Sequence, residues 1–495
     1  MRKPNLIVFT AESYDGRMLG SLGHPALRNA TPHIDRIAEE GTIFENAYTS
    51  HPICCPARAN LWSGRYSHNC ESWNNFKGLE PKMWSLLDQM PETHTWKNFG
   101  KLDYRSGGHT LQARLTAWLG SAGIDKPQYD KDKSQCFEVA DNDDFRHHLA
   151  DWEKIDCAVD FLKEQKEQQQ TEAETKPFFL TISTNLVHAA FKTNRYWLDK
   201  IPEEDVDIPP FDPTDHPCRL YQRMTKAWRY GFDEETVRQV RRIYFAMCAE
   251  LDAMVGTVYD MLKQLGLDDN TYFVFTGDHG EMAMEHREWY KMSMYEGSVR
   301  IPMVMTGPDI VSGQRRQNLV SLIDMCPTLM DMVQLPSPEK ADGESLLPLA
   351  RGDTDESRNW AYACFTGTTL NTTSYMLRKG RWKYVVYVGY PSQLFDIESD
   401  PQELNDLLRE EPQVAAQLDE ELRQIVDYEQ THCDVMDYNK NAFKQWRRQA
   451  KRGVYVDSSY GLIGNPSSDY WEIMDNAFTG YSGEDERKVE KWLES

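Results

Sequence analysis

The 495-residue sequence contains no long apolar run, and its mean hydropathy is −0.67. A helix that crosses a membrane needs about 20 mostly apolar residues in a row, so a membrane span is not expected. Positive charge is also scarce: 55 Lys and Arg residues stand against 78 Asp and Glu residues, a formal net charge of −23. Neutralising nucleic-acid phosphates requires a basic surface, so nucleic acid is not an expected partner.

The ten cysteines are scattered without a zinc-type spacing, and Cys54 and Cys55 are the only close pair. A mostly reduced protein is therefore the simpler interpretation. The apolar run 5–10 near the start is too short for a signal-peptide core and instead predicts a buried strand. We expect the chain to be cytoplasmic, or exported with its leader already removed.

Apolar strands alternate with helical patterns through most of the chain. Runs 5–10, 178–183 and 272–276 are short and apolar, as in buried strands, whereas apolar residues recur with helical spacing over 237–265. The alternation predicts an α/β fold with a large doubly wound mixed sheet that has helices on both faces. Thr31, followed by Pro32, predicts the N-cap of a further helix. The stretch 194–228, rich in Pro, Asp and aromatic residues, is expected to be irregular.

The sequence pattern changes after about residue 351. Residues 374–387 read as a β-hairpin with a turn at Gly380, and helical patterns follow over 415–428, 438–448 and 484–493. A chain of this length can form one large domain and a smaller one. We predict one large domain over residues 1–355, and a smaller C-terminal α+β domain with a helical tail over residues 356–495.

The most informative stretch is 51–58, His-Pro-Ile-Cys-Cys-Pro-Ala-Arg, which contains a Cys-x-Pro-x-Arg pattern from Cys54 to Arg58. A free cysteine is usually a small buried apolar residue. It becomes a nucleophile only when a nearby cation lowers its pKa, and Arg58 could supply that cation. A tyrosine-phosphatase loop places its Arg six positions after the Cys, where this chain has Asn60, so a simple thiolate phosphatase is disfavoured.

Two carboxylates follow predicted strands: Glu12 after the first, and Asp278, in Asp278-His279-Gly280, after the strand 272–276. Open α/β sheets place their ligands at such strand ends. Taken alone, the Asp-His-Gly triplet reads as an ordinary turn. Together, the converging carboxylates suit a hard divalent cation such as calcium.

Cys-x-Pro-x-Arg followed by Ser63-Gly64 resembles the signature of type I sulfatases, and 31–35, Thr-Pro-His-Ile-Asp, is similar to another motif of that family. The resemblance implies that Cys54 is oxidised to formylglycine. It implies a calcium site formed by that residue together with Glu12, Asp278 and His279. The sulfate-binding residues that it implies are Arg58, Lys101, His188 and Lys291, the last matched by its place ahead of Tyr295-Glu296-Gly297.

Two positions depart from the family pattern, because Glu12-Ser13 replaces paired Asp residues and Asp103 replaces a His. The stretches 52–56, 71–78, 100–104 and 284–287 closely resemble one subgroup, which implies a glucuronate-2-sulfatase. The expected partners are then a sulfated saccharide and a formylglycine-generating maturation enzyme. We expect His188 to carry one proton transfer, with His216 a distant second candidate.

The working hypothesis is a calcium-dependent sulfatase that uses a formylglycine made from Cys54. Two alternatives remain open at this stage. One is a phosphatase or phosphonate monoester hydrolase of the alkaline phosphatase superfamily, to which type I sulfatases belong. The other is a non-catalytic binding protein in which Cys54 is unmodified.

Overall fold

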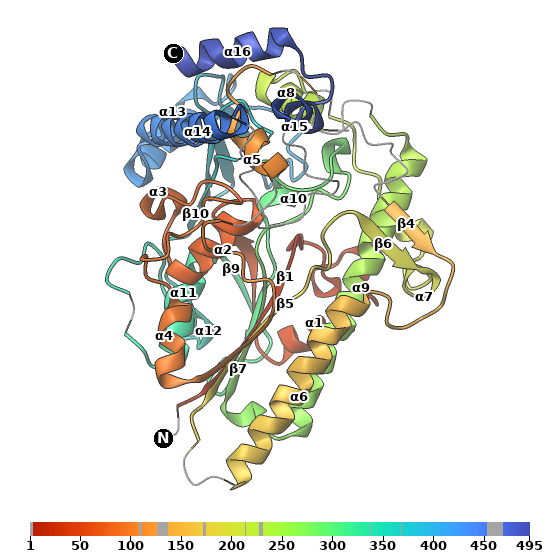
Figure 1. The fold of residues 1–495 in the computed structure, drawn as a ribbon. Coiled ribbons are helices and arrows are strands. Elements are labelled where there is room, and N and C mark those ends of the chain that lie inside the picture. Colours follow the sequence, from red (N-terminus) through yellow and green to blue (C-terminus); the bar gives the residue numbers. More distant parts are fainter. Residues whose placement is uncertain are drawn as a thin grey trace.

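The computed structural model describes residues 3–107, 111–124, 126, 137–171, 175–212, 214–226, 231–336, 338–367, 369–452 and 469–495. Its centre is a seven-stranded sheet (Figure 1). In spatial order the strands are β3 (Thr95–Gly100), β5 (Phe178–Ser183), β1 (Asn5–Ala11), β7 (Thr271–Gly277), β8 (Met303–Thr306), β2 (Thr42–Tyr48) and β9 (Gln314–Ser321). β8 is antiparallel to both of its neighbours and the other adjacent pairs are parallel, so the predicted mixed sheet is confirmed.

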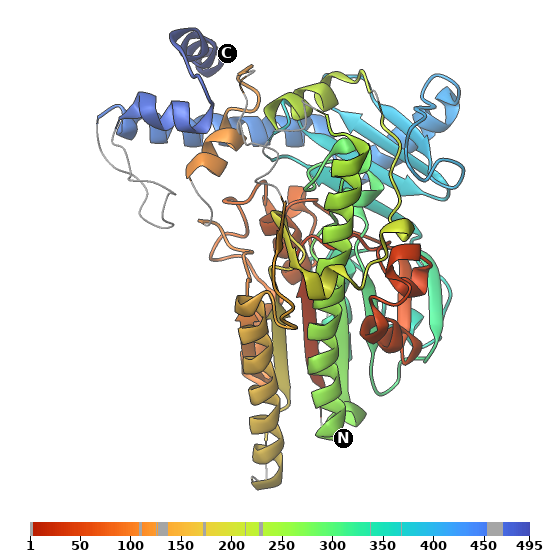
Figure 2. The same ribbon diagram turned by 90° about the vertical axis from the view of Figure 1, so that its right-hand side faces the viewer.

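Helices cover both faces of this sheet because successive residues of the central strand point to opposite sides. In β1, Ile7 and Phe9 belong to one hydrophobic core, whereas Leu6 and Val8 belong to the other. The first core is covered by α1 (Pro32–Glu39), α6 (Leu149–Thr171) and α9 (Glu234–Gln264), and the last two run along the sheet in Figure 2. The second core is covered by α2 (Cys54–Ser63), α4 (Leu86–Thr93), α11 (Met325–Met332) and α12 (Leu347–Ala350).

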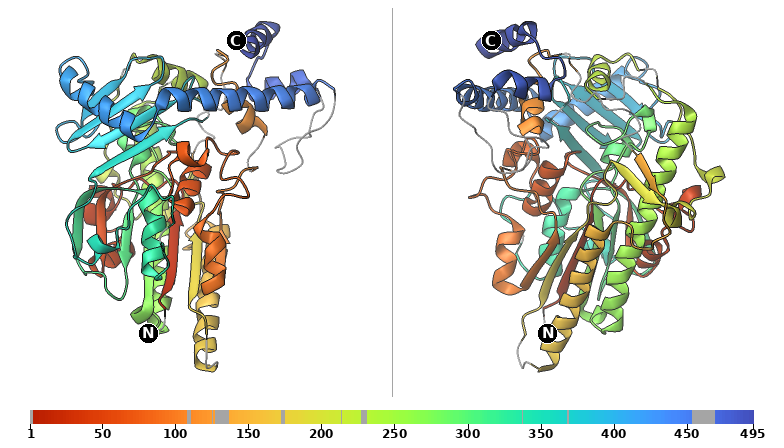
Figure 3. Two further views of the ribbon diagram at one scale, coloured as in Figure 1. Left: turned by 90° about the vertical axis from the view of Figure 1, so that its left-hand side faces the viewer. Right: turned by 45° about the vertical axis from the view of Figure 1, so that its right-hand side comes forward.

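A second sheet lies beyond the end of the large sheet that is opposite the N-terminus (Figure 3). It is antiparallel, in the order β10 (Trp360–Phe365), β11 (Ser374–Lys379), β12 (Trp382–Tyr387) and β13 (Gln393–Asp396). The predicted hairpin is therefore confirmed, with Gly380 at a positive φ of 55° in its turn. The helices that follow are α13 (Pro412–Ile425), α14 (Tyr428–Ala450), α15 (Tyr470–Ala477) and α16 (Gly483–Glu494). The domain boundary at residue 355 stays a prediction.

Two local predictions hold only in part. Thr31 is the N-cap of α1 and Pro32 its first residue, as predicted, but the Thr31 hydroxyl makes no capping hydrogen bond: it accepts from Gly20 N and donates to Asp35 Oδ2. The described parts of 194–228 contain two short helices, α7 (Arg195–Leu198) and α8 (Pro217–Thr225), while the described residues between them are irregular, as predicted, apart from one 3-10 turn. Pro217 at the first helical position is the signal that the composition obscured. The remaining elements are α3 (Ser67–Cys70), α5 (Leu111–Trp118), α10 (Glu296–Val299), β4 (Phe137–Ala140) and β6 (Phe191–Asn194).

Candidate active site

The site is built at the carboxyl ends of adjacent parallel strands. Glu12 directly follows β1 and Asp278 directly follows β7, and these two strands pair in parallel register. Their ends meet because the backbone N–H of Ser13 donates to Asp278 Oδ1 over 3.3 Å. Both carboxylates are buried, at 4% and 0% exposure. The sheet therefore holds two acidic groups together away from solvent.

Cys54 approaches these groups from another segment. It lies in the first turn of α2. Its thiol donates to Glu12 Oε1 over 3.2 Å, and its Sγ lies 3.3 Å from His279 Nε2. Burial raises the pKa of this thiol to about 11, so at neutral pH it is protonated and a poor nucleophile.

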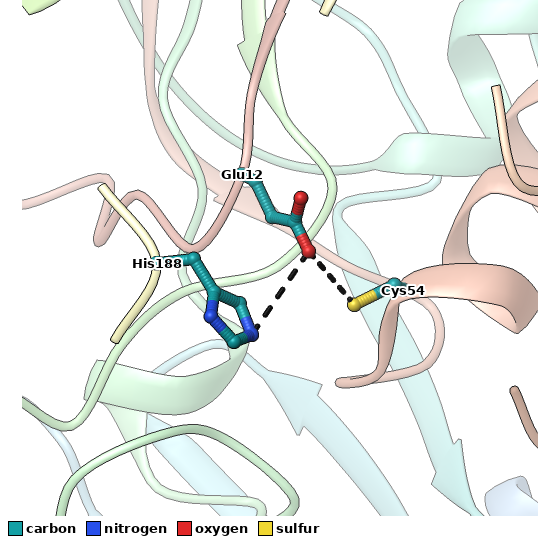
Figure 4. A group of neighbouring side chains, drawn as sticks. All are labelled: Glu12, Cys54 and His188. Carbon is teal, nitrogen blue, oxygen red and sulfur yellow. Dashed lines mark hydrogen bonds and ion pairs between the residues drawn. The ribbon is translucent and has the colours of Figure 1, made fainter. Parts of the chain in front are cut away.

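Side chains around Cys54 form two overlapping groups of potential metal ligands. Glu12, Cys54 and His188 form one group, and Cys54, Asp278 and His279 form the other, with the ligand atoms of each within 4.8 Å of one another. Figure 4 shows the first group, in which Glu12 points to both other side chains. The four predicted metal ligands thus converge, and His188 joins them.

The donor chemistry of this cluster decides which ion it suits. Carboxylate oxygens are ligands that calcium prefers, whereas a thiol sulfur is not. Oxidation of Cys54 to an oxygen-bearing residue would bring the set closer to calcium chemistry. His279 supplies one nitrogen, and its Nδ1 lies 3.0 Å from Gly280 O, which orients Nε2 toward the cluster. With an oxygen on residue 54, three of the four side chains would offer the oxygen donors that calcium takes, and His279 would add one nitrogen.

Basic side chains neutralise the buried carboxylates. Lys101 Nζ donates to Glu12 Oε1 over 2.7 Å. Burial alone would raise the pKa of Glu12, but the positive charge of Lys101, with a smaller contribution from Arg58, holds it well below its ordinary value. Glu12 is accordingly a carboxylate at neutral pH, as a metal ligand must be.

Arg58 lies one turn after Cys54 in α2 and is 2% exposed. Its Nε donates to Asp278 Oδ2 over 2.9 Å, and its Nη1 donates to Lys101 O and to Ser183 Oγ. Its Nη2 is buried and, among the residues that the structure describes, has no hydrogen-bond partner. A buried donor without a partner is costly, so this atom is a ready site for an anionic oxygen.

Lys291 and His188 complete the predicted set. Lys291 Nζ donates to Ser13 Oγ over 3.3 Å, and His188 Nε2 lies 3.9 Å from Glu12 Oε1. Burial lowers the pKa of His188 to about 4, so it is neutral at physiological pH and can take up a proton. His216, by contrast, contacts Pro391 O and Tyr387 and does not contribute.

The site opens to solvent on one side. The side chains of Lys101 and His188 are 24% and 29% exposed, whereas Arg58 and Asp278 are almost completely buried. Tyr290, which is half-buried, packs against His188 with ring centroids 5.6 Å apart. A ligand would thus enter past Lys101, His188 and Tyr290.

The sequence reasoning missed several residues that shape this site. They are Ser13, Ser183 and Tyr290, and the first two had a usable signal, since each stands at or just after the end of a predicted strand. Positive φ angles cluster here at non-glycine residues: 63° at Ser13, 38° at Asp103 and 68° at Tyr290. Such backbone strain is typical of functional sites, but nothing in the residue types indicated it.

Comparisons with known proteins agree with this geometry. The sequence profile of the sulfatase family matches residues 4–335, and a profile described as N-sulphoglucosamine sulphohydrolase, C-terminal, matches residues 284–428. Arylsulfatase K of Canis lupus familiaris is 38% identical over 472 residues, covering 90% of this chain and 86% of that protein. Arylsulfatase K of Homo sapiens is 36% identical over 475 residues, covering 90% and 87%.

Solved structures share the fold at low identity. A phosphonate monoester hydrolase of Agrobacterium radiobacter matches with a TM-score of 0.68 and 22% identity, covering 85% of this chain and 95% of that one. A structure described as a 2-O GAG sulfatase matches with a TM-score of 0.64 and 21% identity, covering 95% and 100%. At these identities the likeness concerns the fold alone.

Proposed function

The chain belongs to the sulfatase family, and from that premise we propose that it hydrolyses the 2-sulfate of a glucuronate by means of a calcium ion and a formylglycine made from Cys54. The chain is a sulfuric ester hydrolase. The substrate position, the ion and the modified residue are the proposed parts. The observation that carries the proposal is the convergence on Cys54 of Glu12, His188 and His279 from three other segments.

Glu12, Asp278 and His279, with residue 54 in its modified form, are the side chains that would hold calcium. When bound, the ion supplies positive charge to sulfate oxygens, and hydrated formylglycine supplies the attacking hydroxyl. Formation of the aldehyde requires a maturation enzyme as a partner. The donor set supports this arrangement, because only an oxygen at position 54 matches the hard carboxylates beside it.

The basic residues of this chain would bind the sulfate group. Arg58 Nη2 has no hydrogen-bond partner among the described residues, and Lys101 and Lys291 present ammonium groups to the same cluster. Fixed donors that are aimed at an anion in a buried site stabilise the charge that develops during bond cleavage. Local cations also offset the overall charge of −23, which repels anionic substrates at long range.

His188 is the candidate for proton transfer, because its partly exposed ring lies at the mouth and its pKa of about 4 leaves it neutral. Its Nδ1 contacts Ala189 O, which leaves Nε2 directed to the site. A neutral imidazole can accept a proton during one step and return it in another. The alkoxide that leaves a sulfate ester needs such a proton.

Support for the glucuronate comes from four stretches, 52–56, 71–78, 100–104 and 284–287, which resemble a glucuronate-2-sulfatase subgroup. A structural relative is described as a 2-O GAG sulfatase, which agrees with a sulfate at position 2 of a sugar. The proposal therefore concerns a 2-sulfated uronate of a glycosaminoglycan-type saccharide.

The test is a panel of defined sugar sulfates assayed with calcium and with protein whose residue 54 has been checked by peptide mass. We expect the highest kcat/KM for glucuronate 2-sulfate. Matched phosphate and phosphonate esters of one alcohol are the controls, because a structural relative is a phosphonate monoester hydrolase. Preference for another sulfated sugar would overturn the substrate, and preference for the phosphorus esters would overturn the sulfatase assignment.

A further inference from the structure

Two lysines lie close to the ring of Tyr290 at the mouth of the site. The Nζ atom of Lys226 lies 5.1 Å from the centroid of the Tyr290 ring, and the Nζ atom of Lys291 lies 5.8 Å from the same centroid. The imidazole of His188 packs on this ring as well. Of these cations, the sulfate-binding set described above uses Lys291 but not Lys226.

Helix α8 fixes Lys226 in this position. Lys226 is the C-cap of α8, and its backbone N–H donates to Gln222 O. The same helix is attached to the segment that carries Tyr290: Gln222 Nε2 donates to Met292 O over 2.8 Å, and Arg223 Nε donates to Glu288 Oε1 over 3.0 Å. Contacts from α8 to residues before and after Tyr290 in the chain therefore hold Lys226 beside the ring.

We propose that Lys226 and Tyr290 form the sugar subsite, in which Lys226 binds the carboxylate of the uronate and the Tyr290 ring packs on the apolar face of the pyranose. This inference rests on the proposed function. A 2-sulfate and a C5 carboxylate project from opposite sides of one pyranose ring, so their cations must stand apart. Lys291, on the sulfate, and Lys226 are two such cations beside one ring, with their Nζ atoms 5.8 Å and 5.1 Å from the centroid of Tyr290.

The chemistry of the two side chains suits this assignment. Lys226 is only 5% exposed, so a carboxylate that reaches its ammonium group is largely desolvated. The attraction between the two charges is then weakly screened by solvent and salt. Aromatic rings bind apolar faces at little entropic cost, and a half-buried Tyr290 keeps one part of its surface accessible. A sugar without a carboxylate would pack on the Tyr290 ring but would gain no charge attraction from Lys226.

The test compares glucuronate 2-sulfate with glucose 2-sulfate, which has a hydroxymethyl group in place of the carboxylate. A hydrogen bond to a charged group contributes about 1.5 to 3 kcal/mol, so Lys226→Met should lower the ratio of the two kcat/KM values about 10- to 100-fold. The loss should appear in the KM for the uronate. Lys226→Arg should retain most of the ratio, and Lys163→Met, on the exposed face of α6, should leave it unchanged.

The ratio of the two kcat/KM values separates a loss of carboxylate recognition from a loss of folded protein, because both substrates are measured on one protein sample. An equal loss for both sugars in Lys226→Met would make Lys226 a structural residue and overturn the inference. An unchanged ratio, or wild-type protein without preference for the uronate, would also overturn it. Wild-type protein that hydrolyses neither sugar sulfate would instead refute the proposed function from which the inference starts.

Discussion

Arg58 and Asp278 form a fully buried ion pair, with Arg58 Nε 2.9 Å from Asp278 Oδ2 and side-chain exposures of 2% and 0%. The pair connects the helix that carries Cys54 to the end of strand β7. It also fixes the guanidinium so that Nη1 reaches Ser183 Oγ while Nη2 is left without a partner among the described residues. Arg58 thus connects the elements of the site through Nε and Nη1, and it retains Nη2 as a donor for the substrate.

Arg58→Lys is therefore expected to reduce kcat/KM by about 10²- to 10³-fold, because an ammonium group cannot reproduce the planar, forked arrangement of N–H donors in a guanidinium group. Steady-state kinetics on a sugar sulfate measure the effect, and thermal unfolding reports the stability. Arg36→Lys is the matched control, since Arg36 pairs with Asp260 at the surface, where both side chains are 38% exposed. Activity of Arg58→Lys equal to that of this control would contradict a substrate role for Arg58.

Cys54→Ala should abolish turnover in protein matured in a competent host. The reason is that a methyl side chain carries no sulfur or oxygen from which the aldehyde of the proposed mechanism could form. Peptide mass of the wild type should show the modified residue at position 54 and an unmodified thiol at Cys55. Cys55→Ala is the control, because Cys55 Sγ contacts Arg105 O rather than the ligand cluster. An unmodified thiol at position 54 in fully active protein would remove the formylglycine from the mechanism.

Calcium should raise the thermal midpoint of the modified protein, and chelation should lower it. A ligand that binds only the folded state at 100 times its Kd stabilises it by about 2.7 kcal/mol. Asp278→Asn and Glu12→Gln should remove most of the calcium-dependent shift, because each neutralises a proposed ligand. Magnesium is the control ion. A calcium shift that survives both substitutions would place the ion elsewhere.

The sequence predicted the framework of the site because strand ends and short motifs are local features. Glu12 and Asp278 follow apolar runs that could be recognised as strands, and parallel strands bring their carboxyl ends to one edge. The start of α2 at Cys54 lacks such a local signal, because Ile53, at its N-cap, is not a residue type that caps helices. The helix carries Cys54 in its first turn.

Tertiary contacts could not be predicted in the same way. Lys226 lies in a stretch that was expected to be irregular, and only the folded chain brings it beside Tyr290, 64 positions later. Ser183 had a signal as the last residue of β5, but its bond to Arg58 depends on the geometry of two distant segments. Composition and spacing predict elements, whereas such pairings depend on how the elements pack.

Lys383→Met should destabilise the protein by about 3 to 5 kcal/mol, the usual cost of breaking a buried ion pair. Lys383, on β12, is 0% exposed and lies 2.7 Å from both Glu296 and Glu403. It also donates to Met294 O and so connects the C-terminal sheet to the segment that follows Lys291. Chemical unfolding measures the loss, and kinetics should show weaker substrate binding as the segment loosens.

Two variants test this interpretation of Lys383. Lys379→Met removes a surface pair with Glu421, whose contribution is expected to be below about 1 kcal/mol. The double variant Lys383→Met/Glu403→Gln should recover part of the stability, because it removes one of the carboxylates left unpaired. If Lys379→Met and Lys383→Met lowered the free energy of unfolding by the same amount, the burial of Lys383 would add nothing to stability.

The last prediction concerns pH and the C-terminal helices. Glu486 of α16 accepts hydrogen bonds from Tyr470 and Tyr481, each over 2.7 Å, and pairs with Arg447 of α14 and with Lys451, the C-cap of that helix. Burial would raise its pKa, but these partners lower it from 4.5 to about 2. A carboxyl group with a lowered folded-state pKa stabilises the fold above its unfolded pKa, and this contribution disappears as the pH falls from about 4.5 to about 2.

Glu486→Gln should accordingly cost on the order of 1 to 2 kcal/mol at pH 7, after allowance for solvent screening, and almost nothing near pH 2. Unfolding of the wild type and the variant at a series of pH values gives the difference directly, with hydrogen exchange of α16 as the local measurement. Glu484→Gln, an exposed position in the first turn of the same helix, controls for the loss of a negative charge there. A difference between wild type and Glu486→Gln that stays constant from pH 7 to pH 2 would show that the carboxylate charge is not what holds α16 against α14.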